Sequence, residues 1–340
     1  MRVSVWHVWG VVPLFLMLFG CSPAEESGKP FVTVWSVGEG NRTITLPTDP
    51  DFTYDYRVEW GDGTADTALT GRATHTYLSA GTYTVNIRGI FPHLIMASGD
   101  IFASVDRDEA DNAAKLIRID AWGDIVWYSM ANAFAHCANL KLTATDKPNL
   151  THVTSLQNMF AGAEMFDGDI GDWNVSGVTD MSGMFYEATH FNQPLQGWDV
   201  SHVTTMRSMF AFARAFDQSL ERWDVSAVTD MTEMFKGAAA FNQPVGSWDV
   251  SHVTSMAGMF ETARAFDQPL CDWNVSRVTD MRRMFRFARS FTRHDLRCWD
   301  AASVTRRDHF LDHAGSDNQE PEWVAAESTG TARVGKAAVQ

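Results

Sequence analysis

A 25-residue period is the feature of this sequence that most constrains its fold. The stretch FNQPLQGWDVSHVTTMRSMFAFARA, residues 191–215, returns several times with the same residues at the same positions. One position holds Trp173, Trp198, Trp223, Trp248 and Trp273, with Trp299 following after a slip of one residue. Another holds Met159-Phe160, Met184-Phe185, Met209-Phe210, Met234-Phe235, Met259-Phe260 and Met284-Phe285. Such a period indicates a solenoid, because a single repeat cannot bury its apolar face whereas a stack of repeats can.

The apolar positions of one repeat predict how each coil is built. We expect Leu195, Trp198 and Val200 to alternate inward on a short strand. Met209 and Phe210 should then face the interior from a short helix or 3₁₀ segment. The tryptophan, methionine and phenylalanine positions are therefore expected to form the core and not a cofactor site.

A longer period of two repeats is superimposed on the first. His202 and His252 occupy equivalent positions, whereas the repeats that follow each of them carry Ala227 and Arg277 there. The simplest explanation is the duplication of a block of two repeats. The two histidines are too far apart to share one metal ion.

Composition limits the possible functions. The chain has 42 acidic and 27 basic residues, giving a net charge of −15, which disfavours nonspecific binding to nucleic acid or to an anionic membrane surface. It contains no G-x-S-x-G, H-E-x-x-H, Walker or G-x-G-x-x-G motif. Its carboxylates recur as columns of the repeat, which is a structural pattern. We therefore expect no enzymatic activity and no cofactor.

The N-terminus resembles a bacterial lipoprotein signal. An apolar run too short to span a bilayer comfortably ends in Leu18-Phe19-Gly20-Cys21, and the chain then turns polar. The resemblance implies a signal peptide over residues 1–20 and lipidation of Cys21, so that only the lipid anchor reaches the membrane. Ser22, in place of an aspartate, implies sorting to the outer membrane in a Gram-negative cell. Residues 21–30 would form a tether, and the alternative is an ordinary secretory signal with a chance cysteine.

Residues 31–91 consist of short alternating apolar runs, which predict a small antiparallel β-sandwich. The runs Trp60-Gly61-Asp62-Gly63, His75-Thr76-Tyr77 and Gly81-Thr82-Tyr83-Thr84-Val85 resemble the polycystic-kidney-disease (PKD) type of immunoglobulin-like module. Such a module implies a spacer or interaction platform on an extracellular protein. Asp62 is expected to hold a turn and not to act as a catalyst or metal ligand. His75 should pack beside Tyr77 or bond across the turn.

Residues 115–313 begin with Ala133-Phe134 and a Cys137-x-x-Leu140 spacing, and they continue with F-N-Q-P-L, W-D-V-S, V-T-x-M and M-F elements. The first part resembles the leucine-rich repeats of BspA-like surface proteins, and the later elements resemble a 25-residue repeat of the same broad group that is also common in mycoplasma lipoproteins. The expected fold is mainly β with short helical turns, a leucine-rich-repeat-like solenoid of about seven coils preceded by a small β-sandwich. Residues 92–114 would be a junction and residues 314–340 a disordered tail.

Two columns of polar side chains could be interpreted as cation ligands, because stacked carboxylates bind Ca²⁺ in some solenoids. One column is Asn174, Asp199, Asp224, Asp249, Asn274 and Asp300, and the other is Asn192, Asp217, Asn242 and Asp267. The exchange of Asp for Asn keeps a hydrogen-bond acceptor but removes the charge. We therefore expect hydrogen bonds to the backbone of the next turn and no metal site.

The cysteines allow one disulfide. Cys271 and Cys298 are separated by one coil plus the slip, so adjacent coils could bring them together, and an exported protein permits the bond. Bonded and free thiols both remain open at this point. Cys137 matches the interior cysteine of the resembled repeat and is expected to be buried and free.

The C-terminal repeats are unusually basic. The candidate partner-binding residues are Arg282, Arg283, Arg286, Arg289, Arg293 and Arg297. A basic face could bind an acidic partner, lipopolysaccharide or nucleic acid. The alternative is a polar cap on the open end of the solenoid, and no specific nucleic-acid partner is expected.

Two functions are compatible with the sequence. The first is a non-catalytic surface lipoprotein of the outer membrane, whose solenoid binds protein or matrix partners; the resemblance to BspA-like proteins implies adhesion. The second is an accessory protein that binds surface polysaccharide, which an exposed row of aromatic rings would favour and a buried tryptophan column would weaken. In both cases, partner contacts are expected at positions that vary between coils, such as Gln196, Gly197, Arg207 and Arg214.

Overall fold

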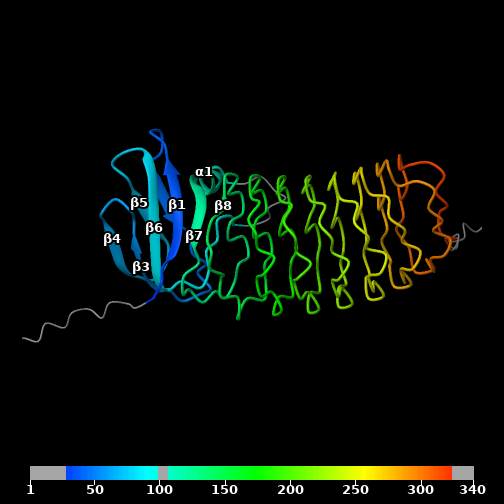
Figure 1. Ribbon diagram of the computed structural model, residues 1–340, viewed down its shortest axis with the longest axis horizontal. Helices are drawn as coiled ribbons and strands as arrows, with labels where there is room; N and C mark the ends of the chain where they lie inside the picture. Colours follow the sequence, from blue (N-terminus) through cyan, green and yellow to red (C-terminus); the bar gives the residue numbers. More distant parts are fainter. Residues whose placement is uncertain (1–27, 99–105, 324–340) are drawn as a thin grey trace, which may run out of the picture.

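The computed structural model describes residues 28–98 and 106–323 (Figure 1). It is mainly β with very little helix, which confirms this part of the expected fold class. The expected signal peptide, Cys21 and most of the expected tail lie outside the described residues. The elements in chain order are β1 (Phe31–Val37), β2 (Thr43–Leu46), β3 (Asp55–Glu59), β4 (Ala65–Leu69), β5 (Ala73–Thr76), β6 (Gly81–Ile90), α1 (Arg107–Lys115), β7 (Leu116–Ala121) and β8 (Lys141–Leu142).

Six strands form one sheet in the order β4-β3-β6-β1-β7-β8. β1 pairs antiparallel with β6 on one side and with β7 on the other. β7 in turn pairs in parallel with β8, and the stacked coils follow from there (Figure 1). The N-terminal sheet therefore continues directly into the stack, because β7 belongs to both.

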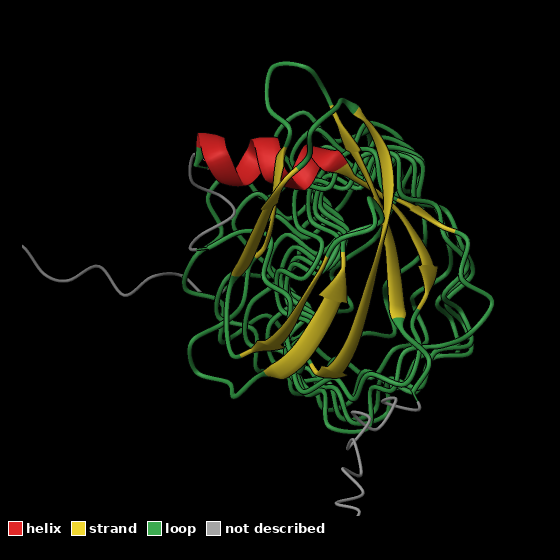
Figure 2. Cartoon of the chain, turned by 90° about the vertical axis from the view of Figure 1, so that its left-hand side faces the viewer, coloured by secondary structure: helices red, strands yellow, loops and turns green. Residues whose placement is uncertain are grey.

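The remaining two strands, β2 and β5, form a separate antiparallel sheet (Figure 2). Ile44 of β2 is buried in the same core as Trp35 of β1. The helix α1 holds β2 through its side chains: the Asn112 side chain accepts from the Thr45 N–H at 2.9 Å and donates to the Thr45 carbonyl at 3.0 Å. The second half of the expected junction is thus an ordered helix that fastens this sheet to the stack.

Aromatic rings join the N-terminal sheets to the first coils. Trp122, which follows β7, stacks on Phe31 of β1 with ring centroids 5.6 Å apart. It also contacts Trp173 of the repeat array in a T-shaped arrangement, with ring centroids 5.3 Å apart. One hydrophobic cluster runs without interruption from Phe31 to Phe310. The N-terminal unit therefore shares the core of the stack, and we infer that it closes the end of the stack.

The repeats form coils that lack the expected short strands. Among the described residues after β8, successive coils meet through parallel bridges of a single residue each. One column of bridged positions is Ser155, Asp180, Thr205, Asp230, Ser255, Asp280 and Arg306, and further parallel bridges join Val126 to Asn149 and Asp295 to Gln319. The prediction of a strand carrying Leu195, Trp198 and Val200 is wrong, because the Trp198 N–H closes a turn onto the Leu195 carbonyl at 3.1 Å, although all three side chains are buried as expected.

Residues in the left-handed conformation explain why no strand or helix forms in the segment that follows each bridge, as after Thr205. Ser208 and Phe212 have φ values of 53° and 59°, so the extended or helical conformation is interrupted every few residues. The N–H groups of Ser208 and Phe210 donate to carbonyls of the next coil at 2.8 and 2.9 Å, whereas the intervening Met209 N–H closes a turn onto Met206. The segment is a run of turns with alternate bonds to the neighbouring coil, in place of the expected helix or 3₁₀ segment.

Like side chains stack on like side chains through the core. The Phe210 ring lies 5.5 Å from that of Phe185 and 5.6 Å from that of Phe235. The tryptophan column from Trp173 to Trp299 is only 3–5% exposed. Trp198 Nε1 donates to the Ile170 carbonyl of the preceding coil at 3.0 Å, which satisfies its buried polar atom. The expected core of Trp, Met and Phe is confirmed.

We predict that Trp122→Ala destabilises the N-terminal sheets and the first coils together. Trp122 is fully buried, so its removal should lower the free energy of unfolding by about 3–5 kcal/mol. Hydrogen exchange should show weaker protection on both sides of the ring, in β1 and around Trp173. Tyr128→Ala, which removes a ring that is 49% exposed, should cost less than about 1 kcal/mol. Loss of protection on one side only would contradict the shared core.

Candidate binding groove

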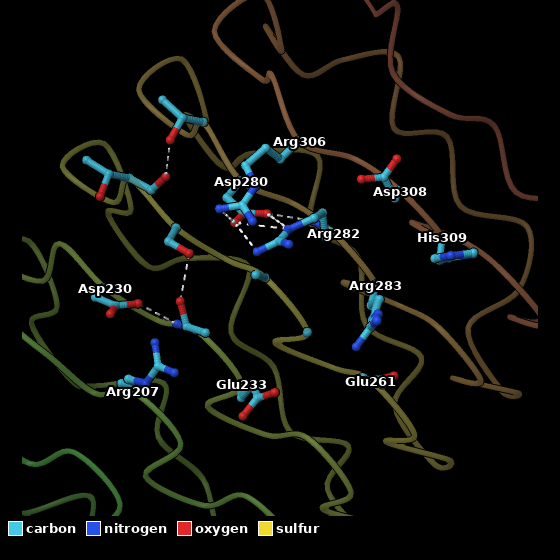
Figure 3. A pocket seen from close by; sticks show the side chains of 16 residues that line it. Arg207, Asp230, Glu233, Glu261, Asp280, Arg282, Arg283, Arg306, Asp308 and His309 are labelled. Atoms are coloured by element: carbon cyan, nitrogen blue, oxygen red, sulfur yellow. Dashed lines mark hydrogen bonds and ion pairs between the residues drawn. The ribbon is translucent and has the colours of Figure 1, made fainter.

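A groove with a volume of about 740 Å³ crosses the C-terminal coils (Figure 3). The groove arises because one coil carries small residues where the two adjacent coils carry large side chains. Ala257 and Gly258 occupy the repeat position at which the preceding coil carries Thr232-Glu233 and the following coil Arg282-Arg283. We call this hollow the central groove; its charged lining residues are Arg207, Asp230, Glu233, Glu261, Asp280, Arg282, Arg283, Arg306 and Asp308, with His309.

The floor of the central groove depends on a glycine. Gly258 has φ +64°, the left-handed region, where glycine is favoured over residues with a side chain. A Cβ at this position would lie 3.2 Å from Cγ of Glu233, which is tight but not prohibitive. Glu233 and Arg283 adopt the same conformation in the adjacent coils at φ 58° and 57°. The coil can therefore carry a side chain here, and its absence in this coil is what opens the groove.

Asp280 organises one wall. Its carboxylate lies 2.9 Å from Arg282 Nη2 and 3.2 Å from Arg306 Nη1. Burial alone would raise the pKa of Asp280, but the hydrogen bonds and charge of Arg282, with the charge of Arg306, outweigh burial and lower that pKa. The wall is thus held by an ionised carboxylate between two guanidinium groups (Figure 3).

A second ion-pair network lies beside the floor. The Glu261 side chain, only 7% exposed, is 3.1 Å from Arg286 Nη1 and 3.6 Å from Lys236 Nζ. Lys236 also pairs with Glu233 at 2.6 Å. Each carboxylate here has a cation partner within the protein, so the charges of this network are neutralised without a ligand.

Some charges of the central groove are left without an ion pair. Within the described residues, the Arg207 and Arg283 side chains have no carboxylate partner, and the carboxylates of Asp230 and Asp308 have no cation partner. The Asp230 carboxylate accepts only from the backbone N–H of Thr232, at 2.8 Å. The groove therefore offers both positive and negative side chains to a ligand, which suits a partner surface of mixed charge.

The six predicted arginines have different surroundings, and two of them line the central groove. Arg282 and Arg283 line the central groove, whereas Arg286 is tied to Glu261. Arg297 pairs with Asp295 at 2.7 Å. The two remaining candidates, Arg289 and Arg293, are exposed and lie outside the groove lining. The sequence missed Ala257 and Gly258, and only a comparison of equivalent repeat positions could have indicated them.

The cysteines are placed in two different settings. Cys271 and Cys298 are joined by a disulfide, with their Cα atoms 5.7 Å apart. Cys137 is free and fully buried, and burial raises the pKa of its thiol. The disulfide connects the last coils, and the buried thiol is not available for chemistry.

The two polar columns have different structural roles. In the column of Asp199, the carboxylate accepts from the N–H of Ser201, two residues further on, at 3.1 Å. The expected bond to the next turn is therefore wrong for this column, because the side chain closes its own turn. In the other column, Asn192 accepts from the N–H of Asp217 in the next coil at 2.9 Å, as expected. The described residues contain no group of three or more side chains that could hold a metal ion.

Asp62 holds its turn. Its carboxylate accepts from the N–H of Thr64 at 3.0 Å and lies 2.8 Å from Nε2 of His75. The side-chain bond from Thr64, followed by that from His75, lowers the pKa of Asp62 to about 2. The His75 ring stacks on Trp60 at 4.9 Å and meets Tyr77 edge-on at 4.6 Å, as the sequence predicted in part.

Comparison with known families now identifies the repeat. A family described as "Mycoplasma protein of unknown function, DUF285" matches residues 128–232 and again residues 217–323. The chain belongs to this family. Its membership accounts for more than half of the 340 residues and supports the mycoplasma-type repeat seen in the sequence. No curated protein and no solved structure matches the chain.

Family membership defines the repeat and leaves the function open, because the family description assigns none. Both matches fall on the stacked coils, and the second covers the whole of the central groove lining outside Arg207. Among the described residues, no helix has the length and apolar character needed to cross a membrane.

We predict that the stability contributed by Asp280 disappears in acid. Its pKa is lowered on folding, so the contribution is complete above the ordinary value of 3.8 and is lost as the pH falls through the lowered value. Asp280→Asn should reduce the free energy of unfolding by about 1–3 kcal/mol at neutral pH. Urea unfolding at a series of pH values should show this difference shrinking below the ordinary pKa. Asp308→Asn, without an ion pair to lose, should give a small difference that depends little on pH.

Proposed function

We propose that the protein is a non-catalytic cell-surface protein that binds another protein through the central groove. The observation that carries this proposal is the pair of unpaired arginines, Arg207 and Arg283, on either side of the floor formed by Ala257 and Gly258. The groove extends over several coils. Most of its carboxylates are ion-paired, and the two without a cation partner, Asp230 and Asp308, lie on different coils. An extended, charged surface of this kind suits a protein partner of mixed charge, and it fits an adhesion-type or matrix interaction.

We further propose that the coils form a leucine-rich-repeat-like solenoid of the BspA-like type and that residues 31–91 form a PKD-like β-sandwich. The cluster of Trp60, His75 and Tyr77 supports the second assignment, because it unites residues of two of the three motifs. Cys137 supports the first, because the matching position of the resembled repeat is an interior cysteine and this thiol is fully buried.

The alternative function is that of an accessory protein that binds surface polysaccharide. The burial of the tryptophan column weakens this alternative for neutral sugars, because stacking on sugar rings requires exposed aromatic faces. Among the described residues, the exposed large hydrophobic side chains include one aromatic ring, Tyr128, which stacks on His152 at 4.8 Å. An isolated ring does not provide the row that this alternative needs.

A test of the central groove fills it with a side chain. In Ala257→Arg, the new side chain copies what Arg207 and Arg282 present at the same repeat position, so the coil should fold. Binding to a panel of immobilised cell-surface and matrix proteins should fall at least about tenfold. Ser182→Arg introduces the same side chain at the same repeat position outside the groove, at the loss of one hydrogen bond between the Ser182 and Thr205 hydroxyls, and should bind as the wild type does. Protein binding that survives Ala257→Arg, or binding to glycans alone, would refute this function.

We also propose that the protein is lipid-anchored through Cys21 at the outer membrane or cell surface. The first described residues support a fixed exit point, because the Lys29 N–H donates to Asp124 at 2.7 Å and Arg88 Nε donates to the Gly28 carbonyl at 3.2 Å. The chain thus leaves the folded part close to the junction between the N-terminal sheet and the first coil.

Cell fractionation tests the anchor. Wild-type protein should sediment with membranes and be cleaved by protease added to intact cells. Cys21→Ala removes the thiol that receives the lipid, so this variant should appear in the soluble fraction. Ser22→Ala keeps the cysteine and should remain with the membranes. A Cys21→Ala variant that still sediments with membranes would show that the anchor is not there.

A further inference from the structure

Arginine recurs at one exposed position of the repeat. Arg214, Arg264 and Arg289 occupy this position, and Ala239 holds it in the coil between the first two. Backbone bonds keep these coils in register: the Ala240 N–H donates to the Arg214 carbonyl and the Ala265 N–H to that of Ala239, both at 3.2 Å. With coils about 4.8 Å apart, Arg214 and Arg264 are separated by about 10 Å and Arg289 lies about 5 Å further on. We call these four positions the arginine stripe.

The residues next to the arginines in the chain are small. Arg214 and Arg264 each follow a buried alanine and precede a half-buried alanine, so neither sequence neighbour shields the guanidinium group. Between Arg214 and Arg264 lies a shallow hollow of about 310 Å³, whose other lining residues are Phe212, Gly237, Ala239 and Thr262. This lining contains no carboxylate and shares no residue with the central groove.

The charges of the stripe are not neutralised within the protein. In the described part of the chain, the side chains of Arg214, Arg264 and Arg289 have neither an ion pair nor a hydrogen bond, unlike that of the neighbouring Arg286. Glu164 occupies the same repeat position, but two coils before Arg214, at about 10 Å. Three unpaired guanidinium groups in one row form a local positive charge in a protein of net charge −15, and this charge would attract an anionic ligand.

We propose that the arginine stripe binds a linear sulfated polysaccharide lying along the axis of the stack. Guanidinium groups pair with the oxygens of tetrahedral anions through two parallel N–H donors, and a sulfated polymer presents such anions repeatedly along one line. Single-stranded nucleic acid would also need exposed aromatic faces on which bases stack. The hollow contains one ring, Phe212, which has Lys236 Nζ 5.9 Å over its centroid, and a single ring does not provide the series of faces that successive bases need.

The test measures binding of the full chain to immobilised heparin, which serves as the sulfated probe. Arg214→Ala combined with Arg264→Ala should weaken binding about tenfold or more, because two charged contacts are lost. The fold should be unaffected, since the native chain already carries alanine at the same position in Ala239. Conversely, Ala239→Arg should complete a row of four arginines and strengthen binding severalfold.

A matched control removes the same charge elsewhere. Arg293→Ala combined with Arg297→Ala should bind heparin within about twofold of the wild type. Chemically desulfated heparin, oligoglutamate and single-stranded DNA are the competing probes, and each should bind much more weakly than heparin.

Several outcomes would overturn the proposal. They are equal binding by the Arg214→Ala/Arg264→Ala variant, an equal loss in the control variant, no gain from Ala239→Arg, or equal binding of any competing probe. Arg283→Ala separates the two sites, because it alters only the central groove and should leave heparin binding unchanged. Failure of the stripe would therefore say nothing against the central groove, and the reverse also holds.

Discussion

The register between successive coils is the constraint on which the rest of the structure depends. The coils repeat the same two links: alternate backbone N–H groups donate to the next coil, and the phenylalanine rings from Phe134 to Phe285 stack one on the next. The slip of one residue before Trp299 shows how strict this register is. The extra residue lies between Phe291 and Leu296, yet the rings of Trp273 and Trp299 remain parallel at 6.3 Å. The insertion does not disturb the column that follows it, and the disulfide between Cys271 and Cys298 joins the two coils just beyond the insertion.

A stack with this register exposes unpaired backbone groups at both ends. The N-terminal sheets pair with the backbone groups at the first of these ends. One edge of β7 pairs in parallel with β8, and its other edge pairs antiparallel with β1. The first coil is therefore covered by antiparallel strands. Trp122 fills the space between the two parts. The consequence for function is mechanical. Because β1 pairs directly with β7 and β7 with β8, a ligand on the coils is held at a fixed position relative to the chain's exit near Gly28.

The sequence was sufficient to predict the stack and its interior, because the period and the apolar columns follow from burial. It was insufficient for the local backbone. The left-handed positions are filled by residues such as Ser208, Phe212 and Glu233, which carry no sign of that conformation. The ion pairs between side chains of adjacent coils could not be predicted from the sequence either. Arg286 looked like part of a free basic face, but Glu261, 25 residues earlier, neutralises it from the preceding coil.

The candidate sites were hard to predict for a physical reason: hollows in a stack are made by side chains that are absent. Ala257 and Gly258 open the central groove, and Ala239 opens the hollow of the arginine stripe. Outward positions can change in this way at little energetic cost, because the buried columns and the backbone bonds of the coil stay the same. The two hollows nevertheless differ in charge. One is lined by acids and bases together and the other by arginine without acid, so the same device should select chemically different ligands at two places on one rod.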